Sequence, residues 1–390
     1  YICCVQKLNS RERKQKMKLQ NSFGAITRNL GLPLLVAIGL IGCNTTTDES
    51  AEHSHDNGEV HSHDHVESHT DVEMFKQAFA NDGIEIADEL VECTLASGTK
   101  TECFQLTVEL NKNRGHEVGP WCPRNVSEGA DSAGIWLDEG QVYDADGNFI
   151  KNLATFYKDD EWQLYNPITG DIKVTDSKQA CLAAAKPNVE AEYQNYCVEC
   201  QPEYVETQTL TYLIPAYPKT GADMYQITAA SGVGLALNGV KFDASAPVDA
   251  ILGAHTLAPF DDFGGHVNPH VGYHYHAVTD KTTKSLGVAN DHATLLGYAA
   301  DGFTLWSHTD TKGSEVSGLD QCNGHSTQAL GYHYHAGAAG SNKILGCFTS
   351  EPGCSVEAGE TECKADMRGN RGAPPVDENG NPLPKPESDQ

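Results

Sequence analysis

The spacing of apolar residues predicts a chain built mainly from β-strands. Residues 72–79 place apolar side chains at helical spacing and predict one short amphipathic helix. From residue 91 onwards apolar and polar residues alternate between turns, and the segments 104–110, 134–137 and 141–143 predict strands. We therefore expect a β-rich α+β fold.

Two segments interrupt this alternation. Asp144, Asp146 and Asn148 have the oxygen spacing that begins a calcium loop, but the distal glutamate is missing, so a hairpin turn is favoured. Residues 175–185 begin with a capping threonine and end before Lys186-Pro187, which predicts a helix.

Changes in composition divide the chain into five segments. Pro215, Pro218 and Gly221 mark the main boundary, beyond which the chain is rich in glycine and short strands. We expect upstream residues and a lipoprotein signal peptide at 1–42, a lipidated histidine-rich tether at 43–75, a disulfide-braced β-rich domain at 76–205, a duplicated domain at 206–365 and a disordered tail at 366–390.

The N-terminal segment has the features of a bacterial lipoprotein leader. Residues 30–41 form a short apolar run, which suits a signal peptide and is too short to cross a bilayer comfortably. The segment 40–43, Leu-Ile-Gly-Cys, resembles the lipobox, in which the cysteine is acylated and becomes the new N-terminus. We expect acylated Cys43 to hold the protein on a membrane of the cell envelope, at the periplasmic face or the cell surface. Met17 is the expected translation start.

Acidic residues dominate the charge of the chain, whose 390 residues carry a formal net charge of -27. Because a surface this acidic repels phosphate backbones, nucleic-acid binding is not expected. The same charge would attract cations, although a merely solubilising surface is the simpler explanation.

Export allows the cysteines to be interpreted as disulfide partners, because exported proteins keep cysteines oxidised. Without Cys3, Cys4 and Cys43 of the leader and the anchor, ten of the 13 cysteines remain. The expected pairs are Cys93–Cys103, Cys322–Cys347 and Cys354–Cys363. Four others, whose pairing stays open, are Cys122, Cys181, Cys197 and Cys200. The last two have the spacing of a redox pair, but structural bridging is favoured.

The tether is rich in histidine and shows no apolar periodicity. Its six histidines, interleaved with acidic residues, are His53, His55, His61, His63, His65 and His69. Flexible imidazoles of this kind can bind zinc or copper without a fold, so we expect the tether to gather metal ions. A soluble spacer is the alternative.

The dominant feature of the sequence is a duplicated histidine motif. Two segments with the pattern Asp-x3-Gly-His-x7-His-x-His lie 59 residues apart, and each contains Gly-Tyr-His-Tyr-His-Ala. The candidate metal ligands are His266, His274, His276, His325, His333 and His335. Residues that could be further ligands or could orient the histidines are Asp261, Asp320, Tyr273, Tyr275, Tyr332 and Tyr334. Upstream segments 237–240 and 300–303 also match, so we expect two β units packed about a pseudo-twofold axis.

The spacing within the motif is that of metal ligands on a strand. Alternate residues of a strand face the same side, so the last two histidines of each motif would project together, with the tyrosines opposite. The Gly-His element eight residues earlier could turn sharply and supply a third imidazole, which leaves a coordination position for water or a substrate. Zinc or copper is the expected metal, in two sites or in one dinuclear centre. Polar core histidines bonded across strands are the alternative, which the duplication disfavours.

Some residues of this half have no counterpart in the repeat. The unmatched histidines are His255, His270, His292 and His308, and none of them is assigned a role. His116 lies in a distinctive segment that has no interpretation. Phe263 stands where the second copy has Cys322, so a disulfide would brace the second copy and apolar packing the first.

These segments resemble the YHYH-domain proteins. The resemblance rests on the two Gly-Tyr-His-Tyr-His-Ala segments, the Gly-His elements and Leu-Gly-Tyr-Ala-Ala-Asp-Gly-Phe at 296–303, and it spans roughly 206–350. Residues 91–205 look like the N-terminal extension of some bacterial members. Members often have cysteine where Phe263 stands, which puts a disulfide in the first copy in doubt. The resemblance implies a type of domain and no particular reaction.

We expect an exported, lipid-anchored metal-binding protein whose motif histidines form the site. One alternative is a metal-dependent enzyme, either a hydrolase or a copper oxidase-like centre, that uses an open position on three histidines. Another is a carbohydrate- or protein-binding β module without metal, with the tyrosines as its contact surface. The expected partners are metal ions and, through the anchor, a membrane.

Overall fold

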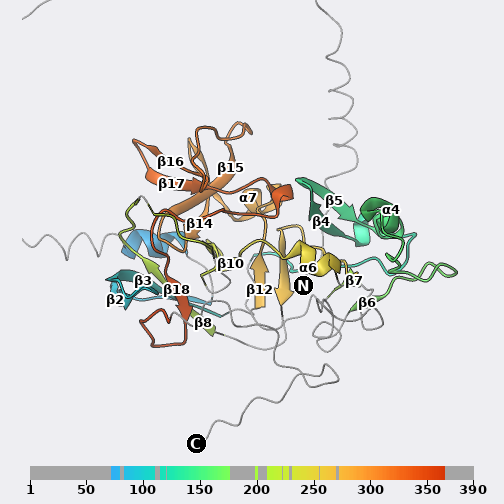
Figure 1. The fold of residues 1–390 in the computed structure, drawn as a ribbon. Helices are drawn as coiled ribbons and strands as arrows, with labels where there is room; N and C mark the ends of the chain where they lie inside the picture. The colour runs from blue at the N-terminus through green and yellow to red at the C-terminus, as the bar shows by residue number, and fades with distance from the viewer. Residues whose placement is uncertain are drawn as a thin grey trace, which may run out of the picture. The chain divides into compact units, whose positions relative to one another are not determined.

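A computed structural model gives the fold of the chain (Figure 1). The described residues are 72–79, 83–109, 115–119, 121–175, 198–200, 209–221, 223–227, 231–253, 255–268 and 272–364. The leader, Cys43, the six tether histidines, the helix expected at 175–185 (apart from Thr175), the tail, Cys181, Cys197 and His270 lie outside them. Within the described residues, no helix is long and apolar enough to cross a membrane.

One sheet joins segments from both ends of the described chain. Its five strands are β1 (Ile84–Ile86), β2 (Val91–Thr94), β3 (Lys100–Glu109), β8 (Thr209–Pro215) and β18 (Cys354–Val356). All pairs are antiparallel, in the order β1-β3-β8-β18 with β2 also on β3. The boundary expected at 205/206 thus lies between two strands that are hydrogen-bonded to each other, β3 and β8. The division into separate domains stays a prediction.

The helix expected near residue 72 is present at 72–78 and packs on this sheet. Val72, Phe75 and Phe79 are at most 2% exposed, and the ring of Phe75 stacks on that of Phe104 in β3 at 4.1 Å. Full burial of one such side chain contributes roughly 1.5–3 kcal/mol, so the helix is held by its apolar face.

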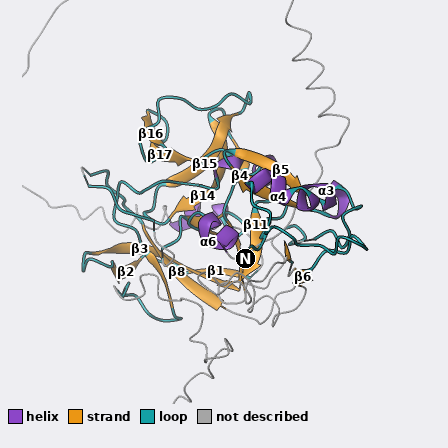
Figure 2. Cartoon of the chain, turned by 45° about the vertical axis from the view of Figure 1, so that its right-hand side comes forward, coloured by secondary structure: helices purple, strands orange, loops and turns teal. Residues whose placement is uncertain are grey.

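The strands expected at 134–137 and 141–143 are present as β4 (Gly134–Asp138) and β5 (Gln141–Ala145), which form an antiparallel hairpin. The other short elements are α3 (Gly147–Lys151), α4 (Leu153–Tyr157), β6 (Val174–Thr175), β7 (Val198–Glu199), α6 (Val248–Gly253), α7 (Asp280–Leu286) and the 3-10 turns Ala130–Ser132 and Ala339–Ser341. Strands predominate and the helices are short (Figure 2), which confirms the expected β-rich fold.

The prediction of a hairpin turn at 144–148 is wrong. Asp146 is the N-cap of α3, and its Oδ1 accepts a hydrogen bond from the backbone N–H of Phe149 at 2.8 Å. The N–H groups of a first helical turn lack partners within the helix, and a capping aspartate supplies one. The oxygens that suggested a turn or a calcium loop therefore start a helix.

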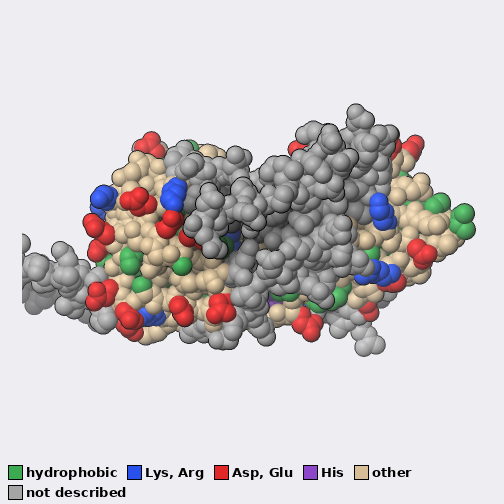
Figure 3. Space-filling model, turned by 90° about the horizontal axis from the view of Figure 1, so that it is seen from below, with side chains coloured by type: hydrophobic (Ala, Val, Ile, Leu, Met, Phe, Trp, Pro, Cys, Tyr) green, Lys and Arg blue, Asp and Glu red, His purple; other side chains and the backbone are tan. Residues whose placement is uncertain are grey.

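Acidic side chains are scattered over the face of the molecule shown in Figure 3, with basic side chains between them. This distribution agrees with the net charge of -27 of the whole chain. The expectations drawn from this charge, that nucleic acid is repelled and cations are attracted, stay predictions.

The second sheet contains the histidine motifs. Its nine strands are β9 (Gly234–Ala236), β10 (Lys241–Phe242), β11 (Gly265–Asn268), β12 (Gly272–Tyr275), β13 (Val288–Ala289), β14 (Ala293–Ala299), β15 (Thr304–Asp310), β16 (Gly324–Thr327) and β17 (Gly331–His335). Their order is β11-β12-β10-β9-β14-β15-β17-β16, with β13 paired to β14. The hairpins of the two motifs therefore lie at opposite ends of the strand order.

The middle of this sheet is symmetric in register. Where β9 and β14 meet, Leu235 lies opposite Tyr298, while Gly234 and Ala236 lie opposite Ala299 and Gly297. Residues 297–299 of β14 correspond to residues 234–236 of β9 at an offset of 63. Leu235 therefore lies opposite its own counterpart, and its two neighbours lie opposite each other's counterparts. Likewise, β10 pairs in parallel with β12 as β15 does with β17. Two copies side by side would have this arrangement; a twofold axis relating them stays a prediction.

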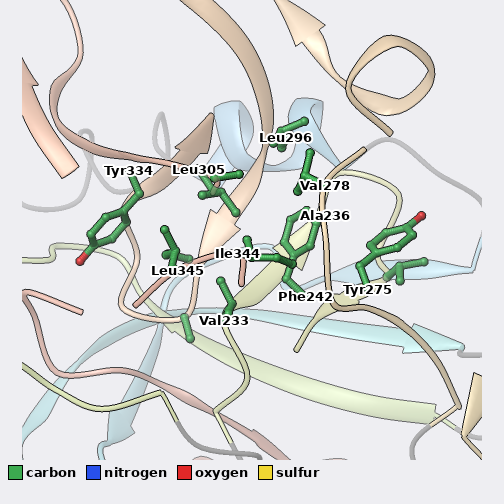
Figure 4. Close-up of a cluster of buried hydrophobic side chains, with 14 of the residues drawn as sticks. Val233, Ala236, Phe242, Tyr275, Val278, Leu296, Leu305, Tyr334, Ile344 and Leu345 are labelled. Carbon is green, nitrogen blue, oxygen red and sulfur yellow. The ribbon is translucent and has the colours of Figure 1, made fainter. Parts of the chain in front are cut away.

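Apolar side chains from both copies fill one core (Figure 4). Phe242 and Tyr275 come from the first copy, Leu305 and Tyr334 from the second, and all four are fully buried. Ile344, from the segment after β17, lies among them. Strand alternation therefore turns the tyrosines of each motif towards this core and the histidines to the other side.

Four pairs of cysteines lie at disulfide distance in the described part of the chain. Three of them are the expected pairs, Cys93–Cys103, Cys322–Cys347 and Cys354–Cys363. The fourth joins Cys122 to Cys200, which are 78 residues apart. Cys200 is therefore a structural cysteine and not half of a redox pair with Cys197.

Replacing Cys322 and Cys347 together with alanine is expected to lower the free energy of unfolding by about 3.5 kcal/mol, because this bridge closes a loop of 25 residues. Urea unfolding of the oxidised proteins measures the loss. The matched control replaces Cys354 and Cys363, whose nine-residue loop predicts a smaller loss of about 2.6 kcal/mol. A larger loss in the control would contradict an origin in loop entropy.

Candidate metal centres

The two Tyr-His-Tyr-His segments form the strands β12 and β17, as their alternation predicts. Each pairs with the Gly-His strand that precedes it, so His266 lies opposite His274 and His325 lies opposite His333. The third histidine of each motif follows two residues later and faces the same side. The cross-strand ladder therefore brings the three imidazoles of one motif together.

The glycine before each cross-strand histidine leaves room for a tyrosine. A Cβ at Gly265 would lie 2.5 Å from the hydroxyl oxygen of Tyr273, and one at Gly324 would collide with Tyr332 in the same way. The expectation that the motif glycine makes a sharp turn is wrong. The turn comes one residue earlier, at Gly264, whose φ of +76° suits a residue without a Cβ.

The first cluster consists of His266, His274 and His276. The Nε2 atom of His266 lies 2.5 Å from that of His274 and 3.0 Å from that of His276. All three side chains are at most 4% exposed. A buried carboxylate lies beside them, since Oδ2 of Asp243 is 3.9 Å from Nε2 of His274.

The second cluster consists of four imidazoles, those of His292, His325, His333 and His335. Five distances between pairs of their Nε2 atoms are 3.0–3.4 Å. His292 comes from the turn between β13 and β14, where Oδ1 of Asn290 accepts a hydrogen bond from its backbone N–H at 2.8 Å. Sequence reasoning missed this ligand because His292 has no counterpart in the first copy; the turn-forming Asn290 is a weak local sign of it.

The second cluster has the dimensions of a tetrahedral metal site. Four nitrogens bound to a zinc ion at about 2.0–2.1 Å would be separated from one another by about 3.3 Å. The Nε2 separations of 3.0–3.4 Å match that value. The first cluster offers three imidazoles of the same kind, and both clusters could hold a metal ion.

The clusters are separate sites. Four strands lie between β12 and β17 in the sheet, and neighbouring strands are about 4.8 Å apart. The metal ions of a dinuclear centre are roughly 3.5–4 Å apart. The arrangement thus favours two mononuclear sites among the possibilities that the sequence leaves open.

For four of these rings, backbone carbonyls determine which nitrogen points to the centre of the cluster. The Nδ1–H groups of His274 and His333 donate to the carbonyls two residues earlier, both at 3.0 Å. Those of His276 and His335 donate to carbonyls beside β10 and in β15. Because a carbonyl only accepts, Nδ1 carries the proton and Nε2 presents a lone pair. Lone pairs that face each other at about 3 Å repel unless a cation lies between them, so this geometry favours a metal ion.

Burial keeps these imidazoles neutral. It lowers the pKa of His274 to about 3 and the pKa values of His333 and His335 to about 4. Burial also lowers the pKa values of His266 and His276. Neutral imidazole is the form that binds metal, so these five rings are in the binding form at neutral pH.

The aspartates of the motif brace the hairpins. Oδ1 of Asp261 accepts hydrogen bonds from two backbone N–H groups of the turn, and Oδ2 accepts one from the hydroxyl of Tyr273 at 2.6 Å. Asp320 accepts the equivalent bonds, including one from Tyr332 at 2.7 Å. Both carboxylates are thus engaged by the hairpin backbone and a tyrosine, and they belong to neither histidine cluster.

Tyr273→Phe is expected to lower the free energy of unfolding by about 2 kcal/mol without changing the metal content, because it removes a buried hydrogen bond to a carboxylate. Tyr332→Phe is the matched control. Its bond to Asp320 is exposed, so the expected loss is below about 1 kcal/mol. Urea unfolding and metal analysis measure the two quantities. A loss of metal from Tyr273→Phe would mean that this tyrosine belongs to the metal site itself.

Three of the four motif tyrosines are too buried to form a contact surface for a carbohydrate or a protein. Tyr273, Tyr275 and Tyr334 are at most 3% exposed. Their hydroxyls are bound to internal partners, such as Asp301 for Tyr334 at 2.7 Å. These three rings pack inside the fold, so they cannot be the contact surface that the alternative assigned to the tyrosines. The alternative of a binding module without metal stays a prediction.

His116, which the sequence left without an interpretation, packs against the first copy. Its ring stacks on that of Phe263 at 3.7 Å, and its Nε2 lies 2.9 Å from the hydroxyl oxygen of Tyr275. Phe263 has the place that Cys322 has in the second copy, where the bridge to Cys347 supplies the bracing. Ring packing therefore supports the first copy, as expected.

One further group combines an imidazole with carboxylates. Nε2 of His255 lies 2.7 Å from Oδ2 of Asp159 and 3.9 Å from Oε2 of Glu161. Both carboxylates are exposed in part, and the three side chains form a further group that could hold a metal ion. His308 similarly lies 3.4 Å from Glu315, away from both clusters.

Comparison with known families identifies one domain in the chain. Residues 211–317 match the family model described as YHYH protein. The chain contains a YHYH domain. The match is narrower than the expected 206–350: it includes the first motif and His292 but ends before the second motif. No curated protein and no solved structure matches the chain. The YHYH domain thus contains the whole first cluster and contributes one imidazole to the second.

Proposed function

We propose that this protein binds zinc or copper ions in the two histidine clusters. The observation that carries the proposal is the convergence of four imidazole Nε2 atoms at 3.0–3.4 Å in the second cluster. That spacing suits a tetrahedral ion, and imidazole nitrogen is a preferred ligand of both metals.

An arrangement without metal explains these histidines poorly. Two facing Nε2 atoms form a hydrogen bond only if one of them is protonated. In His333 and His335 Nδ1 already carries a proton, because it donates to a carbonyl. A second proton on either ring would make it cationic, and burial opposes this strongly enough to lower both pKa values to about 4. Neutral His292 and His325 could each carry their proton on Nε2 instead, but two such N–H groups serve at most two of the five Nε2 contacts.

Metal analysis of the full chain, purified without an affinity tag, tests the proposal. The unmodified protein is compared with a variant in which His274, His276, His333 and His335 are replaced with alanine. The tether is the same in both, so any metal that it holds cancels in the difference. The expected difference is two equivalents of zinc or copper. Equal metal contents in two folded proteins would overturn the proposal.

We also propose that acylated Cys43 anchors the protein to a membrane of the cell envelope, with the tether histidines gathering metal ions near it. The support is the Leu-Ile-Gly-Cys segment directly after an apolar run of signal-peptide length. Labelling with a fatty-acid analogue and membrane fractionation test the anchor. Cys43→Ser should lose both the label and the membrane association, and an unchanged variant would contradict the proposal.

A further inference from the structure

The two clusters differ in the number of imidazoles that they contain. His292 completes the second cluster, whereas the position 63 residues earlier is Ala229, which has no donor side chain. The first cluster consists of His266, His274 and His276 among the described residues. Metal sites closed by four protein ligands are usually structural, and sites with three protein ligands keep a position for water or a substrate.

A carboxylate lies next to the incomplete cluster. Oδ1 of Asp243 accepts hydrogen bonds from the Ala244 N–H at 2.9 Å and lies 3.1 Å from Nζ of Lys241. Its Oδ2 is turned to the cluster, 3.9 Å from Nε2 of His274. The Lys241 ammonium and the backbone thus hold the carboxylate in place through one oxygen, and the other oxygen faces the imidazoles.

The equivalent position of the second copy, which the structure describes, has no carboxylate. The parallel pairing of β10 with β12 and of β15 with β17 makes Trp306 the counterpart of Asp243. The indole N–H of Trp306 donates to Thr304 at 2.9 Å, and its ring lies 6.1 Å from those of His292 and His333. The first copy therefore has a carboxylate beside three imidazoles, and the second copy has an indole ring at the same position beside four imidazoles.

We propose that the first cluster keeps one metal coordination position for a small exchangeable ligand, beside Asp243, while the second cluster is closed. This inference rests on the proposed metal binding. The three imidazoles are at most 4% exposed, so the ligand is of the size of water, azide or formate. A ligand that carries a proton, such as water, can donate a hydrogen bond to Oδ2 of Asp243.

Visible spectroscopy of the cobalt-loaded full chain tests the inference, because tetrahedral cobalt absorption changes when a ligand is exchanged. One variant, with His333 and His335 replaced with alanine, retains the first cluster. The other, with His274 and His276 replaced, retains the second. The spectrum of the variant that lacks both pairs is subtracted to remove cobalt bound elsewhere. Azide is then titrated into each protein.

Azide is expected to shift the spectrum of the first-cluster protein with saturation at one azide per cobalt, and to leave that of the second-cluster protein unchanged. Adding His292→Ala to the second-cluster protein should open a position there and produce the missing response. Asp243→Asn in the first-cluster protein should retain the cobalt and bind azide more tightly, because a negative charge beside the anion is removed.

A response in both single-cluster proteins, or in neither, would overturn the inference while leaving metal binding in place. Absence of cobalt above the subtracted background would overturn the proposed function as well. The unmodified protein, from which the same background is subtracted, provides a further measurement. With both clusters loaded, azide should shift half of the cobalt absorption; a shift of all or none of it would contradict unequal clusters.

Discussion

Replacing His333 and His335 together with alanine is expected to remove one equivalent of metal and to lower the midpoint of thermal unfolding by roughly 8–16 °C. An ion present at 1,000 times its dissociation constant stabilises the folded state by about 4.1 kcal/mol. In a protein of this size each kcal/mol shifts the midpoint by roughly 2–4 °C. Differential scanning calorimetry with metal analysis measures both effects.

The physical reason is the position of the second cluster in the sheet. His292 lies in the turn before β14, and the other three imidazoles lie on the β16–β17 hairpin beyond β15. An ion bound to all four links the turn to the hairpin across two strands. Such a link is absent from the unfolded chain, so the binding free energy contributes to folding.

A chelator separates the effect of the ion from that of the lost side chains. His333 and His335 are fully buried, so alanine also leaves a cavity. EDTA should lower the midpoint of the unmodified protein more than that of the double variant, by the contribution of the second ion. His308→Ala is the matched control, because His308 lies on β15 outside the cluster and contacts Glu315. Equal responses to EDTA in the unmodified protein and the double variant would contradict a stabilising ion.

The metal-free protein is expected to lose stability as the pH falls from 7 to 5, with a contribution of about 2 kcal/mol from His274 alone. Burial lowers the pKa of this histidine to about 3 in the folded state, against about 6.5 in the unfolded chain. Between pH 6.5 and about 3, His274 therefore binds a proton in the unfolded chain but not in the folded protein. The stabilisation is fully present above pH 6.5 and is lost as the pH falls towards 3.

His333 and His335 act with the same sign, since their pKa values are lowered to about 4. Asp301 opposes them, because burial raises the pKa of its carboxyl to about 7 and the folded protein binds this proton more tightly than the unfolded chain does. Burial also raises the pKa of Asp261, which acts with Asp301, and lowers the pKa values of His266 and His276. The five histidines outweigh the two carboxyls, so the net effect of acid is a loss of stability.

Urea unfolding in EDTA at pH 7, 6 and 5 measures the acid sensitivity. His274→Asn removes one titrating ring, so its loss between pH 7 and 5 should be smaller by about 2 kcal/mol than that of the unmodified protein. Equal pH dependence in the two proteins would show that His274 is protonated alike in the folded and unfolded states.

Much of the site follows from local spacing. The period-two alternation of a strand brings His274 and His276 to one side, and the hairpin register places His266 opposite them. Three disulfide pairs follow in the same way, because their partners are close in the chain and close short loops. Local patterns of this kind depend little on the rest of the fold, and the β-rich class could therefore be predicted.

Other features depend on contacts between distant segments. Cys122 and Cys200 are 78 residues apart, and no local pattern marks them as partners. Asp146 could begin a turn or cap a helix, and Ile150, 1% exposed in the core, shows that burial of the helix decided between them. The pattern around residues 144–148 was compatible with both outcomes.

The sequence by itself determined the duplicated motif, the β-rich class and the six histidines that could act as ligands, because all of these depend on spacing along one strand or one hairpin. The tertiary structure decided that the histidines form two clusters, that one of them gains His292, and that Asp243 lies beside the other. His292 lies in a turn and Asp243 lies at the end of a neighbouring strand, and their distances in sequence from the motifs follow no common spacing. Only the packing of the sheet brings their side chains within a few ångströms of the imidazoles.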